Sequence, residues 1–319
     1  MIQVQNVQQQ PSQDVREQLY SQLEDYMGLS STKKKMDSSE KSGGTTLKRK
    51  SSEQSSSSSS SKALSKNTLA IKVNGKTIKG SAQNIVGRVV EAEMGASFRE
   101  EALKAQAVAA YTYIRYNNQK GTIPSLPAKS SVSAKVEDAV EQVIGEALYY
   151  QGEYINATYC ASNAGNSVDS ENVWGGYLPY LRSVESPGDT TLKAYGAVKR
   201  FSEEEIAQYI EENLDVDPYD YSDPDEWFED EEYINGRYVD SIRVCGKRLS
   251  GREAREELME FALPSAAFEV EYDDGEFIFT TYGYGHGVGM SQQGADYFAQ
   301  RGWDYEEILT HYYTGVTLK

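Results

Sequence analysis

The sequence predicts an α+β fold in which mixed helices and antiparallel strands form a single body of two packed lobes. Short runs of β-branched and aromatic residues, such as 277–282, are typical of strands. Segments with apolar residues three or four positions apart, such as 83–94, are typical of helices. Both kinds of segment recur from about residue 67 onward. The 253 residues of 67–319 suffice for one large domain or two closely packed lobes.

The first 66 residues are predicted to be a disordered tail. They are rich in serine, glutamine and lysine, and include an unbroken serine run from Ser55 to Ser61. A segment of this composition cannot bury enough apolar surface to offset the entropy lost on ordering. We therefore expect residues 1–66 to be a tail and residues 67–319 to be the folded domain.

The charged residues divide along the same line. The tail holds 10 of the 32 Lys and Arg residues and 7 of the 49 Asp and Glu residues, which leaves 22 against 42 in residues 67–319. So acidic a body repels phosphates, and nucleic acid is not an expected partner. Cys160 and Cys245 are too few for a disulfide framework, so we expect two small, semi-buried thiols.

The folded part is predicted to open with a hairpin and two helices. Two expected strands, 68–73 and 77–80, flank Asn74-Gly75, which is a strong two-residue turn signal. The second helix is expected to begin at Ser97, with Glu100 reaching back to complete a capping box. That helix is rich in alanine, which allows close packing by its neighbours.

The first of these helices, over about 83–94, carries a candidate acid. Ile85, Val89 and Glu93 fall on one stripe at i, i+4 and i+8, so Glu93 lies on the apolar face. Desolvation disfavours the charged form of a carboxyl group and raises its pKa, as a general acid near neutral pH requires. A buried structural glutamate, paired with an arginine or a neighbouring helix, fits the same pattern.

The middle of the chain is predicted to hold a helix over about 135–147 and a strand over 155–159. A loop of small polar residues, 160–167, follows and leads to Trp174 and Tyr180. Small polar side chains beside aromatic rings are typical of sugar-binding clefts. A structural loop with Trp174 in the core is an equally good interpretation of this segment.

Residues 215–232 are predicted to be an acidic surface insertion. They hold ten Asp and Glu residues and no Lys or Arg. Because the segment lacks the glycine-bearing spacing of a calcium loop, we expect a solvated, mobile loop. A strand over 238–244, a helix after Ser250-Gly251 and a hairpin within 265–282 are expected to follow it.

The most informative stretch, GYGHGVGMSQQGA at 283–295, follows the last of these strands. It alternates four glycines with other residues, includes His286, and precedes a helix that Ser291 caps. Alternating glycines let the backbone approach closely whatever it touches. We expect this glycine elbow to face the same cleft as Glu93; a tight bend that only packs on another backbone is the alternative. The last helix is expected to open with a capping box of Asp304 and Glu307, and His311 within that helix is expected in the core.

Four blocks of sequence resemble the stage II sporulation protein D (SpoIID/LytB) family, which acts on bacterial peptidoglycan. They occur in the order of that family and cover most of the chain from about residue 68. The blocks are AEMGASFREEALKAQAVAAYTYIR at 92–115, ATYCASNAGNSVDSENVWGGYLPYLRSV at 157–184, GKRLSGREAREEL at 246–258, and GYGHGVGMSQQGADYFAQRGWDYEEILTHYYTGVTL at 283–318.

The resemblance implies a lytic transglycosylase that cleaves the bond between N-acetylmuramic acid (MurNAc) and N-acetylglucosamine (GlcNAc) in peptide-stripped glycan strands, during engulfment in sporulation. The family's catalytic residue, a single glutamate that acts as acid and base, is the glutamate of a Glu-Met pair, here Glu93-Met94. This chain departs from the family pattern with Gly95 in place of a proline and Tyr111 in place of an arginine.

The resemblance implies no cofactor. Some members bind zinc through one histidine and two cysteines, but here only Cys160 remains and no histidine precedes His286, so we expect no metal site. With the residue patterns described above, the resemblance yields a set of predicted substrate-binding residues. They are Lys104, Gln106, Ser162, Asn163, Tyr180, Gly285, His286, Gly287, Ser291 and Gln292.

The amidase-modifier branch of the family supplies an alternative, a non-catalytic peptidoglycan-binding enhancer of an N-acetylmuramoyl-L-alanine amidase. The implied partners are glycan strands and a cell-wall amidase of the SpoIIP type, and the implied place of action is the cell envelope outside the cytoplasm. Residues 1–30 show no secretory signal, and no run approaches the roughly 20 apolar residues of a membrane span.

Overall fold

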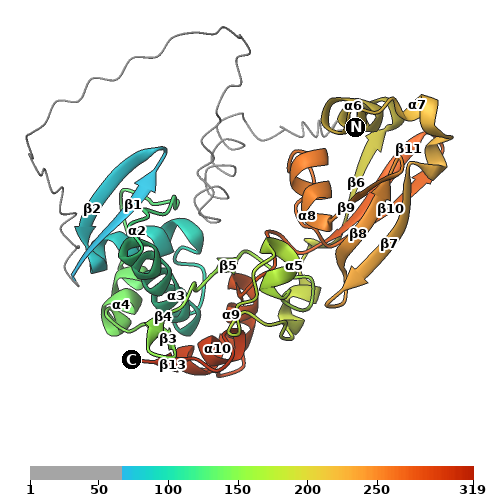
Figure 1. Ribbon diagram of the computed structural model, residues 1–319. Helices are drawn as coiled ribbons and strands as arrows, with labels where there is room; N and C mark the ends of the chain where they lie inside the picture. The colour runs from blue at the N-terminus through green and yellow to red at the C-terminus, as the bar shows by residue number, and fades with distance from the viewer. Residues whose placement is uncertain (1–66) are drawn as a thin grey trace, which may run out of the picture.

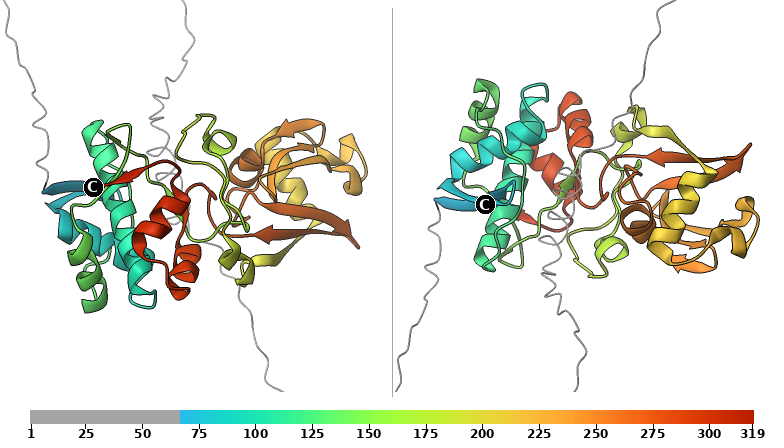
Figure 2. Two further views of the ribbon diagram at one scale, coloured as in Figure 1. Left: turned by 90° about the horizontal axis from the view of Figure 1, so that it is seen from below. Right: turned by 90° about the horizontal axis from the view of Figure 1, so that it is seen from above.

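The computed structural model describes residues 67–319, which pack around two separate hydrophobic cores (Figure 1). One core belongs to a mostly helical part and the other to a part built around two antiparallel sheets; we call them the helical lobe and the sheet lobe. Figure 2 shows the lobes side by side. The predicted α+β fold of mixed helices and antiparallel strands is confirmed. The predicted tail, residues 1–66, lies outside the described residues.

The helical lobe begins with the predicted hairpin, whose strands pair antiparallel around Asn74-Gly75. Helices and a second small hairpin follow. Their bounds are β1 (Thr68–Val73), β2 (Lys76–Ser81), α2 (Ala82–Glu93), α3 (Glu100–Gln119), α4 (Ala134–Val143), β3 (Leu148–Tyr150) and β4 (Glu153–Tyr154). The central helix is α3, whose small alanine side chains let α2 and α4 pack closely on it.

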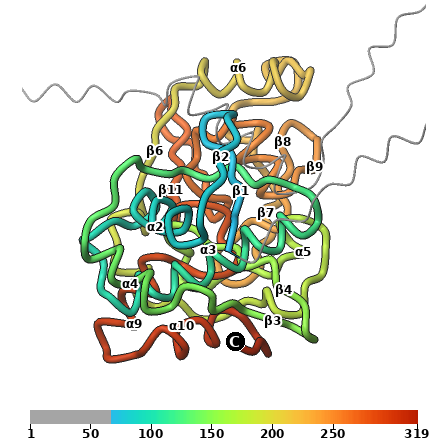
Figure 3. Tube along the Cα trace, turned by 90° about the vertical axis from the view of Figure 1, so that its left-hand side faces the viewer, coloured from blue at the N-terminus to red at the C-terminus, as the bar shows by residue number. Residues whose placement is uncertain are grey.

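The C-terminal end of the chain returns to the helical lobe, where two helices pack against α3 and a short strand pairs with β3. Figure 3 shows these helices and the C-terminus along one edge of the molecule. Ser291 caps the first helix and an Asp304–Glu307 capping box opens the second, as predicted. The elements are α9 (Gln292–Gln300), α10 (Tyr305–Tyr312) and β13 (Thr317–Leu318).

The sheet lobe holds two three-stranded antiparallel sheets, β10-β11-β6 and β7-β8-β9, covered by short helices. Its elements are β6 (Tyr195–Ser202), α6 (Glu203–Leu214), α7 (Pro218–Tyr221), η2 (Pro224–Glu226), β7 (Phe228–Ile234), β8 (Tyr238–Val244), β9 (Lys247–Leu249), α8 (Gly251–Glu253), a π-helical turn (Ala254–Leu258), β10 (Phe268–Asp273) and β11 (Glu276–Tyr282). The strand over 238–244 and the final hairpin agree with the prediction.

The prediction of a mobile acidic loop over 215–232 is wrong. The segment forms α7, η2 and most of β7, and it supplies Trp227 to the core of the sheet lobe. Trp227 is fully buried and stacks on Phe277 with ring centroids 5.4 Å apart. Trp227 and the partly buried Phe228 anchor the segment, because burial of their rings outweighs the solvation of the acidic neighbours.

The predicted start of α3 is also wrong. The helix begins at Glu100 with Arg99 as its N-cap residue, and Ser97 does not cap it. The backbone N–H of Arg99 donates to Asp296 of α9 at 2.7 Å, so a tertiary contact fixes the helix start. Instead of reaching back, the Glu100 side chain pairs with Lys104 at 3.0 Å.

Two further boundaries differ from the prediction. α4 ends at Val143 rather than near residue 147, before Gly145, which has a φ of +105° that no helix accommodates. Instead of a strand over 155–159, only β5 (Tyr159–Cys160) has strand pairing, with β12 (Met290–Ser291). No helix within residues 67–319 is both long and apolar enough to cross a membrane.

Candidate active site

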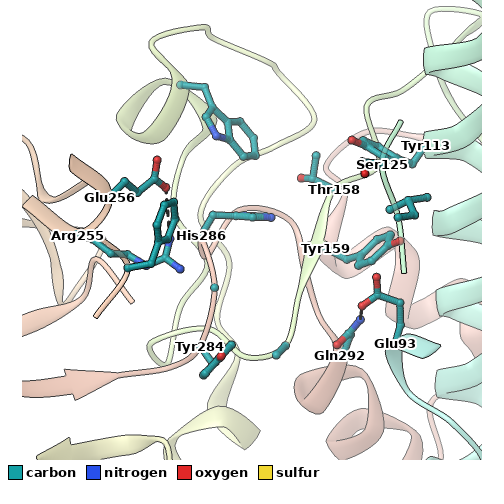
Figure 4. Close-up of a pocket in the computed structure, with 15 residues that line it drawn as sticks. Glu93, Tyr113, Ser125, Thr158, Tyr159, Arg255, Glu256, Tyr284, His286 and Gln292 are labelled. Carbon is teal, nitrogen blue, oxygen red and sulfur yellow. Dashed lines mark hydrogen bonds and ion pairs between the residues drawn. The ribbon is translucent and has the colours of Figure 1, made fainter. Parts of the chain in front are cut away.

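A pocket of about 260 Å³ lies between the helical lobe and the sheet lobe, lined by residues of both (Figure 4). Glu93, Tyr159 and Gln292 stand on one side of it. Arg255 and Glu256 stand on the other side. The glycine elbow crosses between them, so residues far apart in the sequence meet in one cavity.

Glu93, the last residue of α2, has the electrostatics of a general acid. Burial raises its pKa to about 7, and the hydrogen bond from Gln292 opposes that rise only in part. Glu91, two residues earlier, faces away and accepts hydrogen bonds from the hydroxyl and the backbone N–H of Ser133, at 2.7 and 3.1 Å. The Ser133 hydroxyl lowers the pKa of Glu91, so the pKa values of two carboxyl groups on one helix are shifted in opposite directions.

Gln292 reaches Glu93 because strand pairing and a side-chain hydrogen bond hold the elbow in place. Parallel pairing of β12 with β5 places Ser291 beside Cys160, and α9 starts immediately afterwards. The Ser291 hydroxyl donates to Asp189 Oδ1 at 2.8 Å and accepts from the backbone of Gly294 at 2.9 Å. The Nε2 of Gln292, the first residue of α9, then donates to Glu93 Oε2 at 3.0 Å.

The glycines of the elbow are required by close packing. A Cβ on Gly289 (φ +77°) would lie 2.2 Å from the carbonyl oxygen of Thr158, and one on Gly287 (φ +79°) would lie 2.2 Å from the Tyr238 hydroxyl. Because glycine has no Cβ, these two positions let the elbow lie against neighbouring segments. The alternative interpretation, a tight bend that packs on another backbone, describes Gly289, whereas Gly287 packs on a side chain.

His286 lines the pocket as a neutral side chain. Burial, aided by the nearby charge of Arg255, lowers its pKa to about 3. Its Nδ1 accepts a hydrogen bond from the backbone of Val288 at 3.1 Å, so in the neutral ring the proton resides on Nε2. The ring packs against Trp174, with centroids 5.2 Å apart. His311 packs instead among Phe298, Trp303 and Tyr312, away from the pocket.

Four of the predicted site residues line this pocket, and seven do not. Those that line it are Glu93, Gly285, His286 and Gln292. Those that do not are Lys104, Gln106, Ser162, Asn163, Tyr180, Gly287 and Ser291. Of these seven, Lys104 pairs with Glu100 and Glu101 along its own helix, and Gln106 is fully buried inside α3.

The remaining predicted site residues have structural roles. The backbone of Ser162 pairs with that of Tyr284, and Asn163 is fully buried beneath the elbow. Tyr180 is in the core of the helical lobe, where its hydroxyl accepts from the backbone of Asn156 at 3.2 Å. Because Ser291 is fully buried and bound to Asp189, its hydroxyl does not share the pocket with Glu93, contrary to the expectation.

Sequence reasoning missed the wall formed by Arg255 and Glu256. The Ser250–Glu253 capping box starts α8, and a π-helical turn follows, which carries Arg255 and Glu256 to the pocket side by side. Their proximity to Glu93 depends on how the lobes pack, for which the sequence holds no signal. Tyr113, Ser125 and Tyr159, which also line the pocket, were missed for the same reason.

The residues around Cys160 do not fit a zinc site. Its Sγ donates to Asn163 Oδ1 at 3.0 Å, and burial raises its pKa to about 12, so the thiol stays protonated. Within residues 67–319, no three His, Cys, Asp or Glu side chains are grouped to hold a metal ion. Zinc requires deprotonated thiols in a set of three or four ligands.

Comparison with known proteins adds independent information. The family model for SpoIID, described as "Stage II sporulation protein", matches residues 77–152. Stage II sporulation protein D of Bacillus amyloliquefaciens is 33% identical over 274 residues, covering 76% of this chain and 77% of that protein. The Bacillus subtilis (strain 168) protein of the same name is 32% identical over 278 residues, with the same coverage.

A more distant relative bears a different name. The Amidase enhancer of Bacillus subtilis (strain 168) is 27% identical over 295 residues, which cover 72% of this chain and 39% of that protein. The two sporulation proteins are more similar and are matched over about three quarters of both lengths. On this similarity, the chain belongs to the stage II sporulation protein D family.

Proposed function

We propose that this protein is a lytic transglycosylase that cleaves the MurNAc–GlcNAc bond in peptide-stripped glycan strands of peptidoglycan. The observation that carries the proposal is the carboxyl group of Glu93, which lines the pocket between the lobes with a pKa raised to about 7. Such a group is partly protonated near neutral pH, so it can give a proton and later take one back. Membership of the family, with the activity that its resemblance implies, supports the same chemistry.

The reaction needs one acid. Glu93 gives its proton to the glycosidic oxygen as the bond from that oxygen to C1 of MurNAc breaks, which leaves a GlcNAc residue with a free hydroxyl group. The Glu93 carboxylate then takes the proton of the C6 hydroxyl group while O6 bonds to C1. The products are a strand with a 1,6-anhydro end and a strand with a new hydroxyl end, and no water is consumed.

Glu256 is the second carboxyl group among the residues that line the pocket. A hydrolase needs a second carboxylate that attacks C1 or activates water. Both oxygens of Glu256 are engaged by arginines: Oε2 lies 2.9 Å from Arg252 Nε, and Oε1 lies 3.3 Å from Arg255 Nη1. This arrangement favours a structural role for Glu256 and a single-acid mechanism for the site.

The other residues of the pocket fit a sugar ligand. Gln292 fixes the Glu93 carboxyl group by its hydrogen bond. Gly285 contributes backbone to the wall, and the neutral His286 ring adds no charge there. The rings of Trp174 and of Tyr284, which is 57% exposed, offer aromatic faces on which pyranose rings stack.

Replacing Glu93 by glutamine tests the proposal. Glu93→Gln keeps size and hydrogen bonding but has no titratable proton, so we expect a folded protein that binds glycan and releases no 1,6-anhydro products by muropeptide mass spectrometry. Glu91→Gln, on the same helix but facing Ser133, is the matched control and should remain active. Anhydro products from Glu93→Gln, or their loss from Glu91→Gln alone, would contradict the assignment.

A second candidate is a peptidoglycan-binding enhancer of a cell-wall amidase. The specific observation that favours it is the similarity to the Amidase enhancer. In that case the protein stimulates the amidase as well with Glu93→Gln as with Glu93, because enhancement needs no proton transfer. Under either function we propose that the protein acts on glycan strands at the cell envelope during sporulation. The names of the two sporulation proteins support the sporulation role.

A further inference from the structure

The sheet-lobe side of the pocket holds a buried cation, the guanidinium group of Arg255. Arg255 is only 7% exposed, and among the described residues that line the pocket it is the one Arg or Lys. Figure 4 shows it on the side opposite Glu93, with His286 between them. Burial of a cation is unfavourable unless an anion compensates for it, so the groups around Arg255 determine what it can bind.

The protein compensates this charge only loosely. Arg255 Nη1 lies 3.3 Å from Glu256 Oε1, its Nε donates to the Leu263 carbonyl at 3.2 Å, and its guanidinium lies 5.0 Å from the ring centre of Phe261. Arg252 holds the same Glu256 more closely, at 2.9 Å. One carboxylate is thus shared between two guanidinium groups, and Arg255 retains attraction for a further anion.

The cation of Arg255 lies in a strongly acidic part of the chain. Residues 67–319 hold 42 Asp and Glu against 22 Lys and Arg, so the field of the body repels anions. The pocket adds the carboxyl groups of Glu93 and Glu256, and the neutral His286 cannot offset them. A ligand that carries a negative group into this pocket needs a cation there, and Arg255 is positioned to provide it.

We infer that Arg255 binds the lactyl carboxylate of a MurNAc residue in a glycan strand. The inference rests on the proposed function, because it takes the glycan as the ligand of this pocket. In a peptide-stripped strand the lactyl group ends in a free carboxylate, the one anionic group of each disaccharide. In an intact strand the same carbon is an amide, uncharged and attached to the stem peptide.

This difference makes Arg255 a specificity-determining residue. A guanidinium group donates two parallel hydrogen bonds to a carboxylate, and an amide cannot accept both of them or supply the charge. The site therefore selects strands from which the peptide has been removed.

Binding to two matched ligands tests the inference. One is a short GlcNAc–MurNAc oligosaccharide with free lactyl carboxylates, and the other is the same oligosaccharide with lactyl carboxamides. By titration calorimetry with the Glu93→Gln protein, we expect the carboxylate ligand to bind at least about 10-fold more tightly. Arg255→Met should reduce this ratio to within about 2-fold. Arg200→Met removes an exposed guanidinium group that pairs with Glu276 and does not line the pocket, so it should keep the preference.

Equal affinity of the Glu93→Gln protein for the two ligands overturns the inference, and this comparison stands even where Arg255→Met fails to fold. A preference that persists in Arg255→Met, or that is lost equally in Arg200→Met, overturns it as well. Failure of the proposed function is a separate result. If the wild-type protein forms no anhydro products, the carboxylate preference is still measured by binding alone.

Discussion

The Nε2 of Gln292 donates a 3.0 Å hydrogen bond to the carboxyl group of Glu93, across 199 positions of sequence. The bond joins the C-terminal end of α2 to the first residue of α9. It links the residue with the raised pKa to the glycine elbow, so the position of the elbow affects the protonation of Glu93. This relationship leads to the first two predictions.

Glu93 should lower the stability of the native protein at neutral and alkaline pH. The pKa of Glu93 is about 7 in the folded protein, against an ordinary value of 4.5, so folding takes up a proton. The contribution of Glu93 to stability therefore falls as pH rises from about 4.5 to 7. Glu93→Gln does not titrate. We expect the variant to match the wild type near pH 4 and to exceed it by about 1–3 kcal/mol at pH 8.

Urea unfolding at the two pH values measures this difference. Asp189, whose pKa burial raises to about 6, lowers stability over part of the same range, but it does so in both proteins and cancels in the comparison. A stability difference that is independent of pH would show that Glu93 does not titrate as described.

Gln292→Met should move the pH dependence of glycan cleavage upward. The hydrogen bond from Gln292 favours the carboxylate form of Glu93, so its removal raises the pKa of Glu93 further. Because the reaction begins with protonated Glu93, the alkaline limb of the pH–rate profile shifts to higher pH, by up to about one unit. Gln142→Met, which loses a comparable bond to Glu100 far from the pocket, is the control and should leave the profile in place. A downward shift contradicts the account.

Ser291→Ala should destabilise the protein strongly. It removes both the cap of α9 and a hydrogen bond to the buried carboxyl group of Asp189, for an expected loss of about 2–4 kcal/mol. Ser250→Ala removes a helix cap with no buried acid behind it and should cost about 1 kcal/mol. Chemical denaturation of both variants checks the difference, and similar losses would show that the bond to Asp189 adds nothing.

A chain that starts at Asn67 should fold like the full-length protein. Residues 1–66 are rich in serine, glutamine and lysine, so they offer little apolar surface to bury against a folded body. Thermal unfolding should therefore give the same melting temperature for the truncated and the complete chain, within a few degrees. A larger drop on truncation would show that residues 1–66 contribute to the folded body.

The sequence predicts local structure well where the signal is local. The Asn74-Gly75 turn, the caps at Ser291 and Asp304, and the final hairpin all agree with the structure, because neighbouring residues determine them. The start of α3 was predicted wrongly because a contact from Asp296, nearly 200 positions away, fixes it.

In the candidate site, too, the sequence predicts the residues with a local signal and not those placed by long-range packing. Periodicity places Glu93 on the apolar face of its helix, and the glycine pattern marks the elbow, so Glu93 and the elbow residues of the pocket could be expected. Arg255 and Glu256 could not, because their place opposite Glu93 results from the packing of the two lobes. The acidic segment over 215–232 differs from its prediction because the burial of Trp227, and not the charge of the segment, decides its structure.

The central claim is that Glu93 cleaves glycan strands without consuming water. The most direct test is to digest peptide-stripped strands in heavy-oxygen water and to weigh the products by mass spectrometry. We predict unlabelled 1,6-anhydro products, lighter by one water than hydrolytic products, from the wild type and none from Glu93→Gln. Products that carry the heavy oxygen, or anhydro products from Glu93→Gln, would contradict the account.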